Sequence, residues 1–95
     1  MHVELRNIED IQPYSRNPRK NEHAVDAVAK SIQAFGFNQP IVVDQQGEII
    51  VGDTRYKAAR KLGLKQVPVL VATELTPEQI KAYRIADNKT AEIAD

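Results

Sequence analysis

The clearest structural signal in the chain lies in residues 47–63, which run Gly47-Glu48-Ile49-Ile50-Val51-Gly52-Asp53-Thr54-Arg55-Tyr56-Lys57-Ala58-Ala59-Arg60-Lys61-Leu62-Gly63. The apolar run at 48–51 predicts a short strand, and Gly52 ends it. Asp53 or Thr54 then offers a side-chain oxygen to cap a helix that continues through Leu62. Gly63 suits the left-handed position that follows a helix. The segment therefore predicts a strand that turns directly into a helix.

The residues on either side extend this unit into a sheet. Residues 40–44 are a second short apolar run, and Gln-Gln-Gly at 45–47 predicts the turn of a tight hairpin. Residues 67–71 predict another strand, in which Pro68 favours an edge position or the strand start because it lacks an N–H. Residues 3–8 begin with apolar and polar residues in alternation, which is typical of a half-buried strand.

Helices complete the predicted order, which is strand, helix, hairpin, helix, strand, helix. The first begins at Glu22 with Asn21 as its cap, carries apolar residues at 25, 28, 29, 32 and 35 on one face, and ends at Gly36. Two prolines make residues 12–19, which precede it, an ordered loop. The last helix begins at Thr76, and the capping pair of Thr76 and Gln79 marks its start strongly.

Composition narrows the class of protein. The chain has 95 residues, 13 Lys and Arg against 13 Asp and Glu, and no Cys. This size predicts one domain over residues 1–95, and the missing cysteine excludes a disulfide framework and a thiol nucleophile. No run approaches the roughly 20 apolar residues of a membrane helix, so we expect no membrane partner and a cytoplasmic location. Because the last helix lacks a stop signal, we expect a fragment of a longer protein.

The strongest candidate site is the strand-to-helix turn at Gly52, Asp53, Thr54 and Arg55. The first N–H groups of a helix have no partner within the helix, and they point toward an approaching anion. Glycine allows a phosphate to come close to the backbone, Thr54 adds a hydroxyl donor, and the planar guanidinium of Arg55 suits phosphate oxygens. The alternative is purely structural: a glycine that ends a strand, an aspartate cap and a surface charge.

Three weaker segments could complete such a site. One comprises Gly36, Phe37, Asn38, Gln39 and Pro40, whose amide side chains could contact a base or a ribose. The second is the loop around Arg19, where three cations are suited to phosphate contacts. The third is Asp87 and Asn88, since a carboxylate beside an amide suits Mg²⁺. Each is equally compatible with an ordinary turn, a solvated loop or a helix surface, and no Walker motif is present.

Taken together these segments resemble the N-terminal domain of the ParB family, within the ParB/sulfiredoxin superfamily. The resemblance covers nearly the whole chain. It rests on an ordered set of positions: Ile11, Pro13, Asn17, Pro18, Arg19, Gly36, Gln39, Pro40, Ile41, Val42, Val43, Gly47, Gly52, Arg55, Ala58, Ala59, Leu62, Gly63, Val67, Pro68 and Val69. It implies an α+β fold with a small mixed sheet and about three to four helices.

The resemblance also implies a nucleotide site without a P-loop. In ParB-like proteins the nucleotide is CTP, and residues 36–40 and 52–55 are similar to the first nucleotide box and the phosphate box. Asp87 and Asn88 are similar to a third box concerned with Mg²⁺. Thr54 replaces one arginine of the phosphate box, and Asp53 shortens its carboxylate arm. Sulfiredoxin activity is excluded, because its catalytic cysteine is absent here.

Residues 85–92 look more like a branch of the family found beside DNA methyltransferases, or in phage and plasmid proteins called ParB-like nucleases. The function we expect is a Mg²⁺- and nucleotide-binding module, for CTP or ATP, of a DNA-associated protein with a methyltransferase-linked or partition role. DNA would be contacted through the parent protein, and we allow for a homodimer. The alternatives are an enzyme, either a Mg²⁺-dependent nuclease or a small-molecule kinase with Asp53 as its general base, and a protein-interaction domain with a vestigial site.

Overall fold

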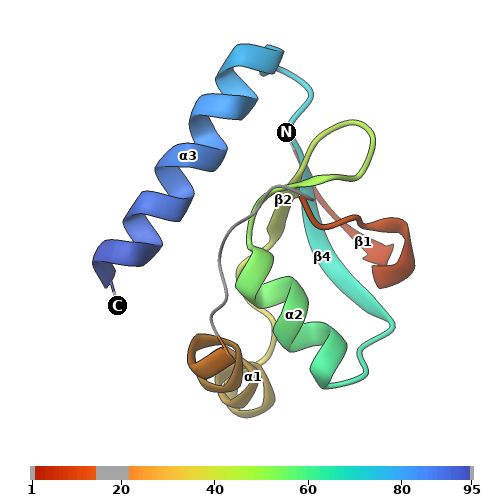
Figure 1. Cartoon of the computed structure of the whole chain (residues 1–95). Coiled ribbons are helices and arrows are strands. Elements are labelled where there is room, and N and C mark those ends of the chain that lie inside the picture. The colour runs from red at the N-terminus through yellow and green to blue at the C-terminus, as the bar shows by residue number, and fades with distance from the viewer. Residues whose placement is uncertain (1, 15–21, 95) are drawn as a thin grey trace.

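The chain forms a mixed sheet with helices on both of its faces. This computed structural model describes residues 2–14 and 22–94, with side chains described as far as Asp87. Its elements, in order, are β1 (Val3–Asn7), the 3-10 helix η1 (Ile8–Asp10), α1 (Glu22–Phe35), β2 (Ile41–Val43), β3 (Ile49–Val51), α2 (Asp53–Lys61), β4 (Gln66–Val71) and α3 (Pro77–Ala94) (Figure 1). The α+β class and the order of the strands and α-helices are as predicted. The cap predicted at Asn21 lies outside the described residues.

The sheet has four strands in the order β1-β4-β2-β3. β4 is antiparallel to β1 and parallel to β2, while β2 and β3 form the predicted antiparallel hairpin. β4 is thus an interior strand, so the prediction that Pro68 places this strand at an edge of the sheet is wrong. The physical reason is the register: pairing with β2 begins at Val69, one residue after Pro68. The N–H that proline lacks is therefore not needed by that neighbour.

The main core lies between the sheet and α2. Tyr56 and Ala59 of α2 pack against strand residues of one sheet face, the largest fully buried of which are Ile41, Val43, Val67 and Val69. Burying a side chain of this kind contributes about 1.5–3 kcal/mol. α1 packs on α2 through a second cluster that includes Val25, Ala29 and Ala58. These contacts fix the start of α2 beside the end of α1.

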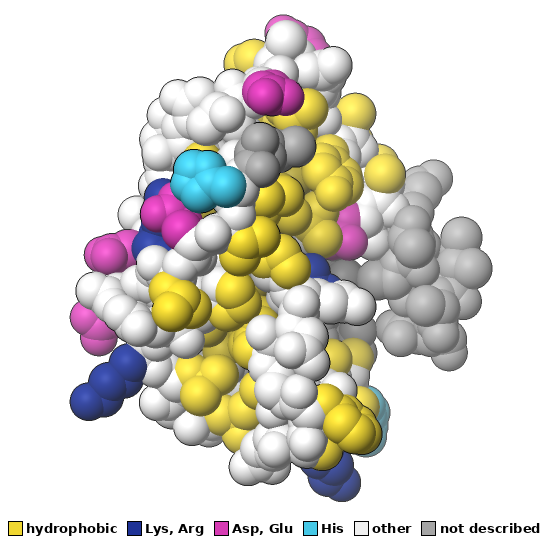
Figure 2. All heavy atoms as spheres, turned by 180° about the vertical axis from the view of Figure 1, so that it is seen from behind, with side chains coloured by type: hydrophobic (Ala, Val, Ile, Leu, Met, Phe, Trp, Pro, Cys, Tyr) yellow, Lys and Arg dark blue, Asp and Glu magenta, His cyan; other side chains and the backbone are white. Residues whose placement is uncertain are grey.

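On the opposite face, apolar residues of the sheet are only partly covered. The first part of α3 covers Val42 and Ile50 with Ile80. Val3 and Leu5 of β1 are instead exposed, Leu5 to 67%. Figure 2 shows hydrophobic side chains gathered on the side of the molecule turned away from the viewer in Figure 1. The alternation in residues 3–8 therefore predicted the strand correctly, but not the burial of its apolar residues, because no described helix lies over β1.

The turns follow their local sequence. Asp44 accepts hydrogen bonds at Oδ1 from the backbone N–H groups of Gln46 and Glu48, each at 2.9 Å. Gly47 adopts a positive φ of 85° and lies against the backbone of η1. At the start of α3, Thr76 and Gln79 bond reciprocally, as predicted: Thr76 N–H donates to Gln79 Oε1 and Gln79 N–H to Thr76 Oγ1. Within the described part of the chain, no helix combines the length and apolarity required to cross a membrane.

Candidate functional site

The start of α2 is built by glycine, not by a side-chain cap. Gly52 occupies the N-cap position with φ 106° and ψ 28°, and no side-chain oxygen caps the helix. Asp53 is already helical, so the expectation that Asp53 or Thr54 caps this helix is wrong. The carboxylate of Asp53, in a residue only 8% exposed, instead pairs with Lys57 at 3.0 Å along the helix. The first amides of α2 thus emerge directly from the strand-to-helix turn.

Arg55 links this turn to the segment that follows α1. Its Nη1 donates to Gln39 Oε1 and its Nη2 to the carbonyl of Pro40, both at 3.2 Å. Nε is buried and has no acceptor among the described residues. A Cβ at Gly52 would lie 3.2 Å from Nη2 and 3.4 Å from Nε. Gly52 is therefore required both for its backbone angle and for the close approach of the guanidinium.

The electrostatic surroundings of Arg55 have two opposing effects. Burial lowers the pKa of the guanidinium, whereas the carboxylate of Asp87 and the hydroxyl of Tyr83 raise it. An arginine remains protonated in proteins under ordinary conditions, so these effects leave a positive charge at the start of α2. Asp87 and Tyr83 are one helical turn apart on α3, so they lie on the same side of that helix.

A cavity of about 300 Å³ lies beside Arg55. It is lined by three residues of α1, by four residues of the segment after it and by one residue of α2: Val28, Ser31, Phe35, Gly36, Phe37, Asn38, Gln39 and Arg55. Phe35, predicted on the apolar face of α1, is 77% exposed and lines the cavity. The volume of the cavity is at the lower end of the range for small-molecule sites, about 300–1,000 Å³. The cavity brings together two segments that sequence analysis nominated separately.

The two amide side chains proposed to contact a base or ribose have partners within the protein. Asn38 Nδ2 donates to the carbonyl of Phe35 at 2.9 Å, in the last turn of α1, and Gln39 Oε1 accepts from Arg55. Gly36 has a φ of 89°, the left-handed conformation that ends α1. These side chains therefore shape the cavity through contacts within the protein.

Of the two proposed metal ligands, Asp87 lies near Arg55, whereas the side chain of Asn88 lies outside the described residues. Arg19, the candidate phosphate contact, also lies outside them. No cluster of three or more His, Cys, Asp or Glu side chains suited to a metal occurs in the described residues. Mg²⁺ is commonly held by one or two carboxylates together with substrate phosphates. Asp87 thus fits a site that is completed by a nucleotide, not a site made by the protein alone.

A larger concavity of about 450 Å³ lies elsewhere on the surface, between η1 and the end of α2. It contains none of the predicted site residues, and charges of both signs line it: Glu9, Asp10, Arg60 and Lys65. The carboxyl end of a helix faces this space, and its partial negative charge disfavours anions. The smaller cavity at the amino end of α2 is therefore the better candidate for a phosphate ligand.

Comparison with protein families gives a match over residues 2–88 to the model of the ParB N-terminal domain. The chain belongs to this family. The ParB-like nuclease domain-containing protein YnaK of Escherichia coli is 38% identical over 82 residues, which are 83% of this chain and 92% of YnaK. The chromosome-partitioning protein Spo0J of Thermus thermophilus is 36% identical over 83 residues, 82% of this chain but only 30% of Spo0J.

Solved structures agree with this assignment. The C-terminally truncated chromosome-partitioning protein ParB from Caulobacter crescentus, complexed with CTP-gamma-S, is 28% identical with a TM-score of 0.79. It covers 95% of this chain and 54% of that one. Sulfiredoxin from Arabidopsis thaliana has a TM-score of 0.72 at 23% identity. The match covers 87% of this chain and 97% of sulfiredoxin, and it shows the shared fold alone.

This ParB-like domain also places residues at the site that sequence analysis missed. Ser31 and Val28 line the cavity from α1, and Tyr83 acts on Arg55 from α3. Tyr83 and Asp87 are four residues apart in the sequence, which places them on the same face of a helix. This spacing could have indicated that the two residues act at the same site. Ser31 could not have been identified from the sequence, because a serine in a helix is most often a solvated residue.

Proposed function

We propose that this ParB-like domain binds a nucleoside triphosphate, CTP or ATP, together with Mg²⁺. The phosphates would lie at the amino end of α2 against Arg55, and the nucleoside would lie in the cavity beside residues 36–40. The observation that carries the proposal is Arg55 itself: a guanidinium held at the cavity wall by two hydrogen bonds, at the amino end of a helix. The complex of the Caulobacter ParB with CTP-gamma-S supports this choice of ligand.

The parent protein would connect this site to DNA. The matched region makes up 30% of the Thermus partition protein and 24% of the Coxiella burnetii ParB, so most of each of these chains lies outside it. We propose the same for this chain, as the nucleotide module of a DNA-associated protein with a methyltransferase-linked or partition role. A homodimer would be detected by light scattering with and without nucleotide.

Calorimetric titration with CTP, ATP, GTP and UTP, each with and without Mg²⁺, tests the proposal. Binding of at least one of them is expected at millimolar concentration or below, with higher affinity in Mg²⁺. The absence of heat with all four, at several temperatures, would remove nucleotide binding as the role of this domain.

Asp87→Asn tests the metal role. If Asp87 holds Mg²⁺ against the phosphates, the variant should bind nucleotide about tenfold more weakly in Mg²⁺ but no more weakly in EDTA. If Asp87 serves only as the counter-charge of Arg55, the variant should bind more tightly in both conditions, because the phosphates no longer compete with a carboxylate. The matched control is Glu78→Gln, which removes an exposed carboxylate from the first turn of the same helix.

A Mg²⁺-dependent nuclease, or a small-molecule kinase, is the second candidate. The name of YnaK, a ParB-like nuclease domain protein, favours the nuclease. Asp53 would be the general base, but its carboxylate is buried and paired with Lys57 at 3.0 Å, which disfavours proton abstraction. Nicking of a supercoiled plasmid in Mg²⁺ would support this activity. Nicking that persists in Asp53→Ala would remove Asp53 from it.

A further inference from the structure

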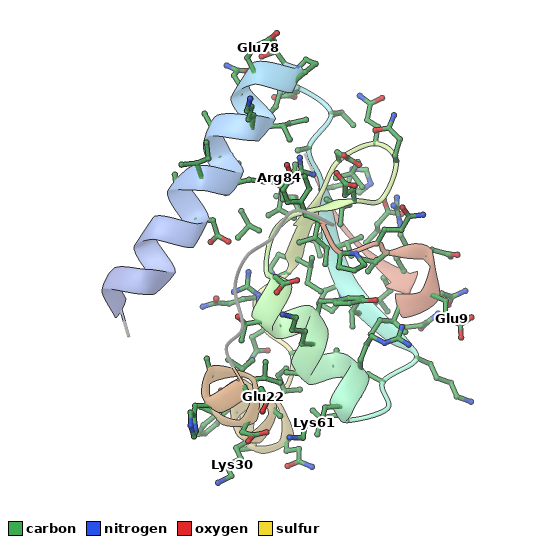
Figure 3. The ribbon with its side chains drawn as sticks, viewed as in Figure 1. Glu9, Glu22, Lys30, Lys61, Glu78 and Arg84 are labelled. Carbon is green, nitrogen blue, oxygen red and sulfur yellow. The ribbon has the colours of Figure 1, made fainter. Side chains whose placement is uncertain are left out.

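α3 is attached to the sheet by its first two turns. Ile80 packs with Leu75 against Val42 and Ile50 on the sheet face opposite α2. One turn further on, Arg84 reaches back to the β2–β3 hairpin (Figure 3). The carboxyl-terminal half of the helix then extends away from the sheet (Figure 1). The orientation of this half therefore depends on the attachments at Ile80 and Arg84.

Arg84 is the more specific of these two attachments. Its Nε donates to the carbonyl of Ile49 and its Nη2 to Glu48 Oε1, both at 3.0 Å, with Asp44 Oδ2 at 3.6 Å. The guanidinium carbon lies 4.3 Å from the centroid of the Tyr14 ring. The side chain is only 13% exposed. An apolar contact tolerates sliding, whereas several directed bonds and a ring contact permit one orientation.

The same helix presents Asp87 to Arg55. Three residues advance an α-helix by about 300°, so Asp87 projects about 60° around the axis from Arg84. Arg84 therefore faces the hairpin, while Tyr83 and Asp87 lie near enough to Arg55 for their charge effect to oppose, in part, the lowering of its pKa by burial. Because the helix is a stiff rod over one turn, rotating it to release Arg84 would also turn Asp87 away from Arg55.

We infer that Arg84 is a positioning residue of the nucleotide site: by bonding to the β2–β3 hairpin it fixes the rotation of α3 and so holds Asp87 opposite Arg55. The inference rests on the proposed function for its effect on ligand binding. Arg84 itself bonds to Ile49 and Glu48, so its influence on the ligand is exerted through Asp87.

A double-mutant cycle measures this coupling. Arg84→Gln should weaken nucleotide binding in Mg²⁺ about fivefold, and the loss should disappear in an Asp87→Asn background. Arg84→Lys, which keeps the charge without the planar fork, should restore affinity only in part. The matched control is Arg60→Gln. Arg60 also lies over a tyrosine, Tyr56, and bonds to its hydroxyl, but from α2, and its removal should leave affinity unchanged.

A ligand-free measurement separates this inference from the proposed function. The Nε–Hε resonance of Arg55 in the NMR spectrum should shift in Arg84→Gln in the same direction as in Asp87→Asn, and stay in place in Arg60→Gln. If Arg84→Gln is too unstable to study, Glu48→Gln removes the negative charge of one of its acceptors and should produce a smaller shift of the same sign. An unmoved resonance, or losses that add in the cycle, would overturn the role of Arg84. If no nucleotide binds the wild type, the proposed function fails, and the resonance still decides whether Arg84 positions Asp87.

Discussion

Gly47→Ala is expected to lower the free energy of unfolding by about 2–4 kcal/mol, enough to reduce the melting temperature by roughly 10–25 °C. Two effects add. Gly47 has a φ of 85°, which a residue with a Cβ adopts only under strain. That Cβ would also lie 2.7 Å from the carbonyl oxygen of Asp10, a backbone atom that cannot rotate away.

The strain would spread because Gly47 lies where the hairpin meets the first loop. Gln12 N–H donates to the carbonyl of Gly47, and Ile49 N–H donates to the carbonyl of Gln12, both at 2.9 Å. Moving Gly47 away from Asp10 would break this pair of bonds. Since a domain of this size has a stability of about 5–15 kcal/mol, the variant would retain its fold with a small margin.

Gly63→Ala separates the two effects. Gly63 also has a positive φ, 72°, but a Cβ there meets no atom within 4 Å. It should therefore show only the backbone penalty, about 1 kcal/mol. Thermal and urea unfolding, followed by circular dichroism, measure both variants. Equal losses would show that the contact with Asp10 relaxes, and would contradict the larger effect expected at Gly47.

The local elements were predictable because the deciding interactions are local. The reciprocal bonds of Thr76 and Gln79, the positive φ of Gly36 and the β2–β3 turn each depend on residues within about four positions of one another. Apolar periodicity then identified α1 and α2. Local signals of this kind are sufficient for the order of the elements.

Longer-range features could not be predicted from these signals. Pro68 favoured an edge strand, yet the register of β4 against β2 begins one residue later. Alternation favoured burial of Leu5, but burial depends on whether a helix lies over β1. Asp53 was expected to cap α2, and instead pairs with Lys57, because Gly52 alone makes the turn. In each case the outcome depended on a neighbour distant in sequence or on competition between two partners.

The candidate site shows the same division. Motifs at 36–40 and 52–55 were visible as sequence, and the cavity brings several of their residues together, with Arg55 between the two segments. The contribution of α3 was less visible. Arg84 is one of many charged residues in the sequence, and only the fold reveals that its guanidinium is largely buried among Tyr14, Glu48 and Ile49.

Arg55→Gln is expected to weaken nucleotide binding about 100-fold, because the variant loses two charge-assisted hydrogen bonds to phosphate. Arg55→Lys should lose about tenfold, because an ammonium keeps the charge but not the fork. Stability should change by no more than about 1 kcal/mol. The buried Nε, which lacks an acceptor in the described structure, is removed by the change to glutamine, and that partly offsets the lost bonds to Gln39 and Pro40.

Arg60→Gln controls for the loss of an arginine from the same helix. Arg60 lies in the last turn of α2, at the opposite end of the helix from Gly52, and contacts Tyr56, so its removal leaves the candidate site intact. Isothermal titration with the preferred nucleotide measures each affinity, and thermal unfolding confirms that each variant is folded. A folded Arg55→Gln protein that binds nucleotide as tightly as the wild type would contradict the placement of the phosphates. The ligand would then have to contact the protein away from the amino end of α2. At such a place, the partial positive charge of the helix start would not attract an anion.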